Sequence, residues 1–256
     1  MPFTISHTIA VYPFVRWTPK YLSISGLVMG SMAPDFEFFL RLELYGIIGH
    51  TFWGIFWFDL PVSIVILLLF HQVVREPLIL HLPNFLLERF GGFVNIKWLE
   101  YFKKHYFRVV FSILLGIFTH FLWDNFTHEP DYVSPVYFDF LLQKCEVFGV
   151  KKYFFSILQI ISSFTGLAGF LIVVFRLKRR STLYICSYLL KVYYWAAVGI
   201  MAVTIVGLRY WWGVPNEKPN EQLLVVLIGG SLISLTLVSW IWQMRNASNG
   251  NKKSSI

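Results

Sequence analysis

Three residues that can bind a metal ion follow one another at intervals of four near the middle of the chain. His120, Asp124 and His128 lie in the stretch THFLWDNFTH, residues 119–128. On a helix this i, i+4, i+8 spacing places the side chains on one stripe, which drifts by only about 80° over two turns. His120 and Asp124 can share an ion, whereas His128 lies about 12 Å from His120 along the axis. We therefore expect His128 to serve a second ion, a substrate phosphate or the support of a ligand.

The helix that carries this stripe is one of several long apolar segments. Hydrophobic residues make up 56% of the chain and charged residues only 14%, against roughly 25% charged residues in a soluble domain. A soluble protein with buried helices is the alternative, but stretches such as LLVVLIGGSLISLTLVSWIW have no polar face for water. The sequence predicts an all-α, polytopic membrane bundle with interfacial or re-entrant helices and five transmembrane segments, at residues 55–74, 107–123, 154–175, 182–207 and 222–243.

The net charge of +8 is explained by where the lysines and arginines lie. The basic cluster FRLKRR, residues 175–180, adjoins a span and is expected on the cytoplasmic side. Counting spans from it places residues 75–106 and the C-terminus inside, and residues 124–153, with five acids against three bases, outside. No nucleic-acid partner is needed to explain the charge. The N-terminus has no basic start of the kind a cleavable signal peptide shows, and the two cysteines fit no metal or disulfide spacing.

The chain divides by chemistry, although we expect one structural domain. Residues 1–150 bear the candidate site, and residues 151–256 form three transmembrane helices and a disordered C-terminal tail. The aromatic, basic segment 75–106 suits the inner interface. Gly26 and Gly30 form a GxxxG pair that allows close helix packing, in an apolar segment too short to span.

Candidate ligands from four distant segments fall on the outer side of this topology. The predicted orientation rests on lysines and arginines alone. That all the candidate ligands fall on one side is therefore an independent observation, and it favours their convergence. Histidine nitrogen and aspartate oxygen suit zinc, with manganese or iron as alternatives, and charged groups near lipid are costly unless paired or coordinated. The candidates are His7, Asp35, Glu37, His50, His120, Asp124 and His128.

A structural interpretation competes with the metal site. His120 and Asp124 alone would also suit a hydrogen bond between helices. Glu37 alone suits a supporting or surface role, and Asp59, inside the first span, suits a helix-packing hydrogen bond. His71, His81 and His105 are expected to be interfacial polar groups outside the cluster.

Three motifs together resemble a known family. MPFTISH at the start, GSMAPDFEFFLR at 30–41 and THFLWDNFTH at 119–128 are similar to the hallmarks of a bacterial integral-membrane family called domain of unknown function 4184. The order of histidine, Pro-Asp, histidine and HxxxD more distantly resembles inner-membrane metal-dependent hydrolases and the zinc-dependent phospholipase C and single-strand nuclease superfamily. That resemblance implies metal ligands at His7, Asp35, His50, His120 and Asp124, with Asp124 suited to bridge two ions.

The chain departs from that superfamily in its later ligands. No histidine follows His128, so a later HxxxE helix for a third zinc is missing, and there is no mature N-terminal tryptophan. One or two ions therefore fit better than three.

The leading hypothesis is a metal-dependent hydrolase of the bacterial inner membrane, acting outside the cytoplasm on a phosphoester or phospholipid-like substrate drawn from the membrane lipid. Asp35, His50, His120 and Asp124 would hold the first ion, and His7 with Asp124 a second. Glu37 or His128 would act as catalytic base or orient water. The alternative is a non-catalytic membrane protein, a transporter or assembly factor, whose cluster holds a structural metal or relays protons. The sequence shows no internal repeat of the kind transporters often carry.

Overall fold

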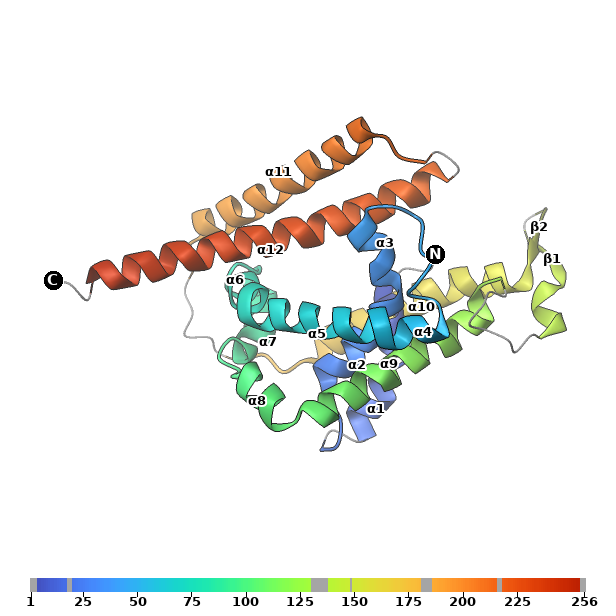
Figure 1. Cartoon of the computed structure of the whole chain (residues 1–256), viewed down its shortest axis with the longest axis horizontal. Coiled ribbons are helices and arrows are strands. Elements are labelled where there is room, and N and C mark those ends of the chain that lie inside the picture. Colours follow the sequence, from blue (N-terminus) through green and yellow to red (C-terminus); the bar gives the residue numbers. More distant parts are fainter. Residues whose placement is uncertain are drawn as a thin grey trace. The chain divides into compact units, whose positions relative to one another are not determined.

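The protein is almost wholly helical (Figure 1). The computed structural model describes residues 4–17, 20–129, 138–147, 149–180, 186–215 and 218–253. Five helices in this part of the chain are long and apolar enough to cross a membrane, which confirms the predicted multi-pass membrane architecture. They run over Phe52–Leu80, Tyr106–Thr127, Phe154–Arg176, Tyr188–Trp212 and Pro219–Ser248.

The first of these spans is not a regular α-helix throughout. It consists of α4 (Phe52–Gly54), η3 (Ile55–Asp59), α5 (Leu60–Leu69), η4 (Phe70–Val74) and α6 (Arg75–Leu80), and both η3 and η4 are π-helical. Single π-turns inside α-helices often mark functional positions. The first π-turn ends at Asp59, the one carboxylate in the span before Glu76. The span continues six residues beyond the predicted end at 74.

The chain folds into two compact units, each built from segments that are distant in sequence. The first unit comprises Met1–Glu37, Gly46–Val65 and His105–Arg176. Its elements are η1 (Thr4–Ile9), α1 (Tyr12–Trp17), α2 (Ile24–Gly30), η2 (Ala33–Asp35), the start of the first span, α9 (Tyr106–Thr127), η6 (Asp139–Leu142), β1 (Lys144–Val147), β2 (Val150–Tyr153) and α10 (Phe154–Arg176). Helix α10, expected in the C-terminal part from residue 151 onward, thus belongs with the N-terminal segments.

Helix α2 packs closely against α9, as the GxxxG pair predicts. A Cβ built on Gly30 would lie 2.1 Å from the carbonyl oxygen of Ile113, and one on Gly116 would lie 2.4 Å from that of Leu27. Real Cβ atoms do not approach backbone so closely, so only glycine allows this contact from either side. The backbone N–H of Ser23, the N-cap of α2, also donates a hydrogen bond of 2.8 Å to the Oγ atom of Ser112 on α9. This packing fixes the position of α9 along its own axis relative to the loop that follows α2.

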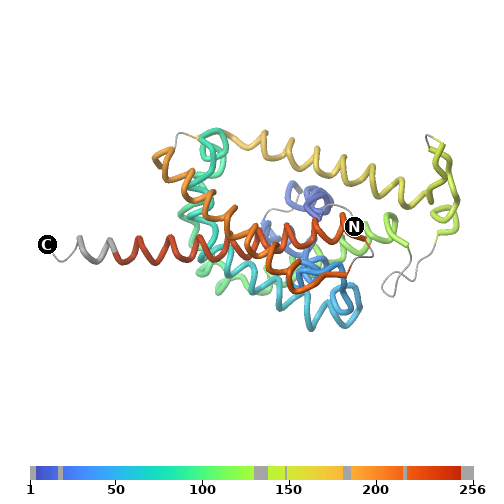
Figure 2. Tube along the Cα trace, turned by 90° about the horizontal axis from the view of Figure 1, so that it is seen from above, coloured from blue at the N-terminus to red at the C-terminus, as the bar shows by residue number. Residues whose placement is uncertain are grey.

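A third glycine brings the N-terminal segment onto α10. A Cβ on Gly166 would lie 2.5 Å from the Cβ of Ser6, which is fully buried in η1. Helix α10 is one uninterrupted helix, coloured yellow to orange in Figure 2. Because η1 rests on this helix, the side chains of Thr4 and His7 are fixed beside α9 and α10.

A two-stranded hairpin precedes α10, in a chain for which the sequence predicts helices alone. Strands β1 and β2 pair antiparallel, with Val147 opposite Val150. Gly149 takes a φ of +77° in the connecting turn, a conformation that glycine adopts without strain. The β-branched valines at the turn favour extended backbone, so this short departure has a local cause.

The second unit comprises Phe38–Tyr45, Ile66–Lys104 and Leu177–Ile256. Besides most of α3 (Phe36–Arg41) and the later part of the first span, it contains α7 (Asn84–Phe90), η5 (Gly91–Phe93), α8 (Trp98–Lys104), α11 (Tyr188–Trp212) and α12 (Pro219–Lys253). Helices α11 and α12 run side by side (Figure 1). Helix α12 continues through most of the segment for which the sequence predicts a disordered tail, and α7 and α8 are short, as expected for a segment that does not span.

Candidate metal centre

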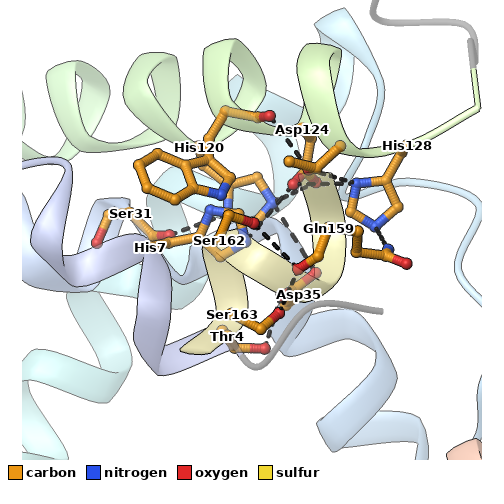
Figure 3. Close-up of polar contacts among 12 residues, drawn as sticks. Thr4, His7, Ser31, Asp35, His120, Asp124, His128, Gln159, Ser162 and Ser163 are labelled. Atoms are coloured by element: carbon orange, nitrogen blue, oxygen red, sulfur yellow. Dashed lines mark hydrogen bonds and ion pairs between the residues drawn. The ribbon is translucent and has the colours of Figure 1, made fainter. Parts of the chain in front are cut away.

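Five predicted ligands converge in the first unit. His120 and Asp124 project from the last two turns of α9, His7 from η1 and Asp35 from the end of η2, as Figure 3 shows. His50 lies two residues before α4. Two overlapping groups have all their ligand atoms within 4.8 Å of one another: His7, Asp35 and His120, and His50, His120 and Asp124. The predicted convergence of these distant segments is confirmed, and the metal itself stays a prediction.

Four ligand atoms surround one point. The Nε2 atom of His50 lies 3.4 Å from Nε2 of His120 and 3.6 Å from both Oδ1 of Asp35 and Oδ2 of Asp124. The Nε2 atom of His120 lies 3.1 Å from Asp124 Oδ2 and 3.9 Å from Asp35 Oδ1. A tetrahedral zinc ion with bonds of about 2.0–2.2 Å holds its ligand atoms roughly 3.3–3.6 Å apart. Five of the six separations among these atoms thus fall close to the edges of such a tetrahedron.

The orientation of His120 follows from a backbone contact. Its Nδ1 atom lies 2.9 Å from the carbonyl oxygen of Ser31, the residue just after α2. A carbonyl only accepts, so Nδ1 carries a proton, and in the neutral ring Nε2 presents its lone pair to His50 and Asp124. The glycine packing between α2 and α9 places this carbonyl, and the arrangement is the one that metal-binding histidines usually have.

Asp35 is supported in a similar way. The Thr4 hydroxyl donates a hydrogen bond of 2.6 Å to Asp35 Oδ2, which leaves Oδ1 facing the histidines. Asp35 is almost fully buried, on the single 3₁₀ turn that begins at Ala33. Sequence reasoning missed Thr4 and Ser31 because supporting contacts of this kind have no sequence signature.

His7 is the most unusual side chain of the cluster. It is fully buried, and neither ring nitrogen forms a hydrogen bond with the described residues. Its Nε2 atom lies 3.5 Å from Asp124 Oδ1, and its ring stacks on His120 with centroids 4.2 Å apart. Burial, with His120 adding to it, lowers the pKa of His7 to about 4. His7 is therefore neutral at pH 7, with its lone pair free for a metal ion.

His128 lies at the C-cap of α9, close to Asp124. Its Nδ1 atom lies 3.2 Å from Asp124 Oδ1 and its Nε2 atom 2.9 Å from the amide nitrogen of Gln159 on α10. Because Asp124 Oδ2 faces His120, its two oxygens point to different histidines, as a bridging ligand requires. Gln159 is a further contact that sequence reasoning missed, since a lone glutamine in a span has no distinguishing pattern.

Glu37 holds the loop that carries His50. Its oxygens accept three backbone N–H groups, from Ile47 at 3.0 Å, Ile48 at 2.8 Å and Gly49 at 2.7 Å. Its side chain is 1% exposed. These contacts favour a positioning role for Glu37 over the predicted role of catalytic base.

Asp59 does not make the helix-packing hydrogen bond expected from the sequence. It is fully buried, and neither oxygen forms a hydrogen bond with the described residues. A Cβ built on Gly49 would lie 3.4 Å from Asp59 Oδ1, so the carboxyl group reaches the loop beside His50. The predicted hydrogen bond is therefore wrong for the described residues, because the carboxyl group faces the loop at Gly49, where neither oxygen meets a donor.

The three remaining histidines make unrelated contacts. His71 stacks on Trp98 with centroids 4.4 Å apart, and Arg75 Nη1 donates to its Nδ1 at 3.1 Å. His81 is buried and its Nδ1 lies 2.7 Å from the carbonyl oxygen of Pro77. His105 is the N-cap of α9, at the opposite end of that helix from Asp124. His81 is thus a buried packing residue just beyond the end of the first span, and its interfacial position stays a prediction.

Comparison with known proteins gives one family. A sequence profile matches residues 1–248, nearly the whole chain. The chain belongs to the family described as Domain of unknown function (DUF4184). Searches among curated proteins and among solved structures each give no match. The resemblance of the three motifs to DUF4184 is thereby confirmed, whereas the more distant likeness to metal-dependent hydrolases stays a prediction.

Proposed function

We propose that the His/Asp cluster is a divalent metal centre that hydrolyses phosphoesters, with membrane lipid as the source of substrate. The observation that carries the proposal is the near-tetrahedral set formed by Asp35, His50, His120 and Asp124, with its five separations of 3.1–3.9 Å. A hydrogen-bonded cluster alone explains this set less well, because the fully buried His7 ring forms no hydrogen bond with the described residues.

The donor types favour zinc, with manganese or iron as alternatives. Neutral imidazole and carboxylate oxygen are common zinc ligands. The first ion would be held by Asp35, His50, His120 and Asp124. A second would be held by His7 and by Asp124, whose Oδ1 atom lies 3.5 Å from His7 Nε2.

The chemistry follows from this charge arrangement. A divalent ion supplies a Lewis acid that polarises a phosphoryl oxygen and makes water acidic enough to attack near neutral pH. The water oxygen bonds to phosphorus, the phosphorus–ester oxygen bond breaks, and the alcohol leaves with a proton. His128 is placed to carry that proton, because its side chain is 28% exposed and its Nδ1 lies 3.2 Å from Asp124. Gln159 fixes its ring.

The site is proposed to lie at the outer face of a bacterial inner membrane. The residues of the cluster lie at the C-terminal end of α9 and just before α4, where His50 lies. Gln159, near the start of α10, contacts the cluster through His128. These are the same ends of three spans in the predicted topology, and the lysine and arginine distribution places them outside. A C-terminal reporter should then be active only in the cytoplasm. Activity only outside would reverse the orientation.

The test uses the full chain in mild detergent. Elemental analysis should give one or two zinc, manganese or iron ions per chain, and a screen of phosphate esters should show turnover that a chelator abolishes and added metal restores. Metal without turnover would favour the non-catalytic alternative, a transporter or assembly factor with a structural metal. Absence of both metal and turnover would overturn the proposal.

A further inference from the structure

An apolar groove of about 490 Å³ runs along the first unit beside the cluster. Helices α9 and α10 form its walls, with residues just after η1 and in α1 closing one side. Its lining includes Phe118, Leu122, Phe126, Leu158, Ile161 and Thr165, and none of the lining residues is charged. Its volume lies within the range of about 300–1,000 Å³ typical of small-molecule pockets.

The groove and the cluster share a wall. On α9 the groove takes residues 118, 119, 122, 123, 126 and 127, while the cluster takes 120, 124 and the C-cap residue 128. Consecutive residues on a helix are about 100° apart, so the two sets form adjacent stripes. On α10 the same relation holds between Leu158 or Ser162 and Gln159, which binds His128. A molecule in the groove therefore lies beside the helix faces that carry His120, Asp124 and Gln159.

Two groove residues reach the cluster directly. The centroids of the Trp123 and His7 rings lie 6.0 Å apart, and the indole N–H of Trp123 is buried without a hydrogen bond to the described residues. The Thr127 hydroxyl lies 3.2 Å from His128 Nδ1. A ligand can therefore be apolar in the groove and polar where these two side chains meet the cluster. The indole N–H is a ready donor to an oxygen at that junction.

The surroundings of the groove indicate what fills it. Both of its helices are long and apolar enough to cross a membrane. Phe118, Leu122 and Ile161 are 61%, 50% and 52% exposed, so the groove opens toward the medium around the spans. In a bilayer that medium is hydrocarbon, and an acyl chain can enter sideways without crossing water. The lining carries no charged side chain, so a charged partner finds no counterion there.

We propose that the groove binds one acyl chain of a phosphate-bearing membrane lipid and so presents the lipid phosphate to the His/Asp cluster. The assignment of the phosphate rests on the proposed function, whereas the assignment of the acyl chain rests on the groove. If the groove binds the acyl chain, the substrate is a lipid, and the protein distinguishes substrates by the length of that chain.

The test uses two neighbouring residues of α10 that differ in one respect. Thr165 lines the groove, and Phe164, 71% exposed, does not. Among the described residues, the hydroxyl of Thr165 bonds only to carbonyl groups of its own helix. Thr165→Trp fills the groove, and Phe164→Trp adds a similar ring outside it. Thermal stability and metal content should be unchanged in both variants.

The substrates are hexadecyl 4-nitrophenyl phosphate and ethyl 4-nitrophenyl phosphate, which share the same leaving group. We expect wild type and Phe164→Trp to favour the hexadecyl ester, and Thr165→Trp to lower this kcat/KM preference at least ten-fold while keeping the rate on the ethyl ester. An unchanged preference in Thr165→Trp would overturn the inference and leave the proposed function standing.

Binding is measured independently of turnover. Phosphatidylglycerol with a diazirine in one acyl chain, in phosphatidylcholine nanodiscs, should label Leu122 and Ile161 in wild type and Phe164→Trp, and label them much less in Thr165→Trp. Such labelling without hydrolysis of either ester would support the acyl site and count against the proposed function. Labelling spread evenly over the spans, or equal in both variants, would mean that detergent, bulk lipid or another protein covers the groove, and would overturn the inference.

Discussion

The Nε2 atoms of His50 and His120 face each other at 3.4 Å, although 70 residues separate them in the chain. In a neutral His120 ring the one proton lies on Nδ1 and is donated to Ser31, which leaves a lone pair on Nε2. Two ring nitrogens at this distance attract each other only when a cation or a proton lies between them. With Asp35 and Asp124 beside the same two atoms, a divalent cation satisfies all four groups at once.

Asp124→Asn is expected to reduce bound metal at least ten-fold. The substitution keeps the size of the side chain but removes the charge from the residue whose oxygens lie 3.1 Å from His120 and 3.2 Å from His128. Metal content of the purified protein measures the effect. His105→Ala, at the far end of the same helix, should leave the metal unchanged. Equal metal in wild type and Asp124→Asn would remove Asp124 from the ligand set.

Glu37→Gln should loosen the loop that carries His50. A glutamine retains one accepting oxygen, so at least one of the three backbone hydrogen bonds is lost. Losing a buried hydrogen bond to a charged acceptor costs roughly 1.5–3 kcal/mol. We expect a lower melting temperature and weaker zinc binding by titration calorimetry. Glu100→Gln serves as control, because Glu100 is exposed and its ion pair among the described residues is with exposed Lys97. A catalytic base would instead show normal metal binding and stability with lost turnover.

Gly30→Leu should destabilise the first unit and lower its metal content together. The new side chain would meet the Ile113 backbone, since even a Cβ lies 2.1 Å from its carbonyl oxygen. Overpacking typically costs about 1–3 kcal/mol, and backbone cannot yield as a side chain does. Gly199→Leu on α11 is the control, because nothing lies within 4 Å of a Cβ there. Thermal unfolding in detergent compares the two, and an equal melting temperature would contradict the close α2–α9 contact.

The spans and the convergence of ligands were predictable because each leaves a local pattern. Apolar length predicts a transmembrane helix, and GxxxG predicts close packing of Gly26 and Gly30. The i, i+4 spacing of His120 and Asp124 predicts a shared face. The distribution of lysines and arginines also predicts that His7, Asp35 and His50 lie on the same side of the membrane as His120 and Asp124.

The supporting contacts were not predictable in the same way. Ser31 acts through its backbone carbonyl, which every residue has, and Thr4 and Gln159 are ordinary polar residues until the fold places them beside Asp35 and His128. The contacts of Glu37 are of the same kind, because its three partners are backbone N–H groups of a loop ten to twelve residues away. Such roles depend on which residues the fold brings together, and no local sequence pattern predicts that.

His81 should make stability depend on pH below neutrality. Burial lowers its pKa below the usual 6.5, so the folded protein holds the neutral ring. Its Nδ1 proton bonds to the Pro77 carbonyl, the ring stacks on Tyr194, and the charge of Lys191 further disfavours protonation. A lowered pKa contributes stability that is present above pH 6.5 and is lost as the pH falls toward the folded value, at up to about 1.4 kcal/mol per pH unit. His81→Gln can still donate to Pro77 but does not titrate, so the gap in melting temperature between wild type and variant should shrink from pH 7.5 to pH 5.5. A gap that stays constant over that range would mean that His81 does not titrate differently in the folded and unfolded protein.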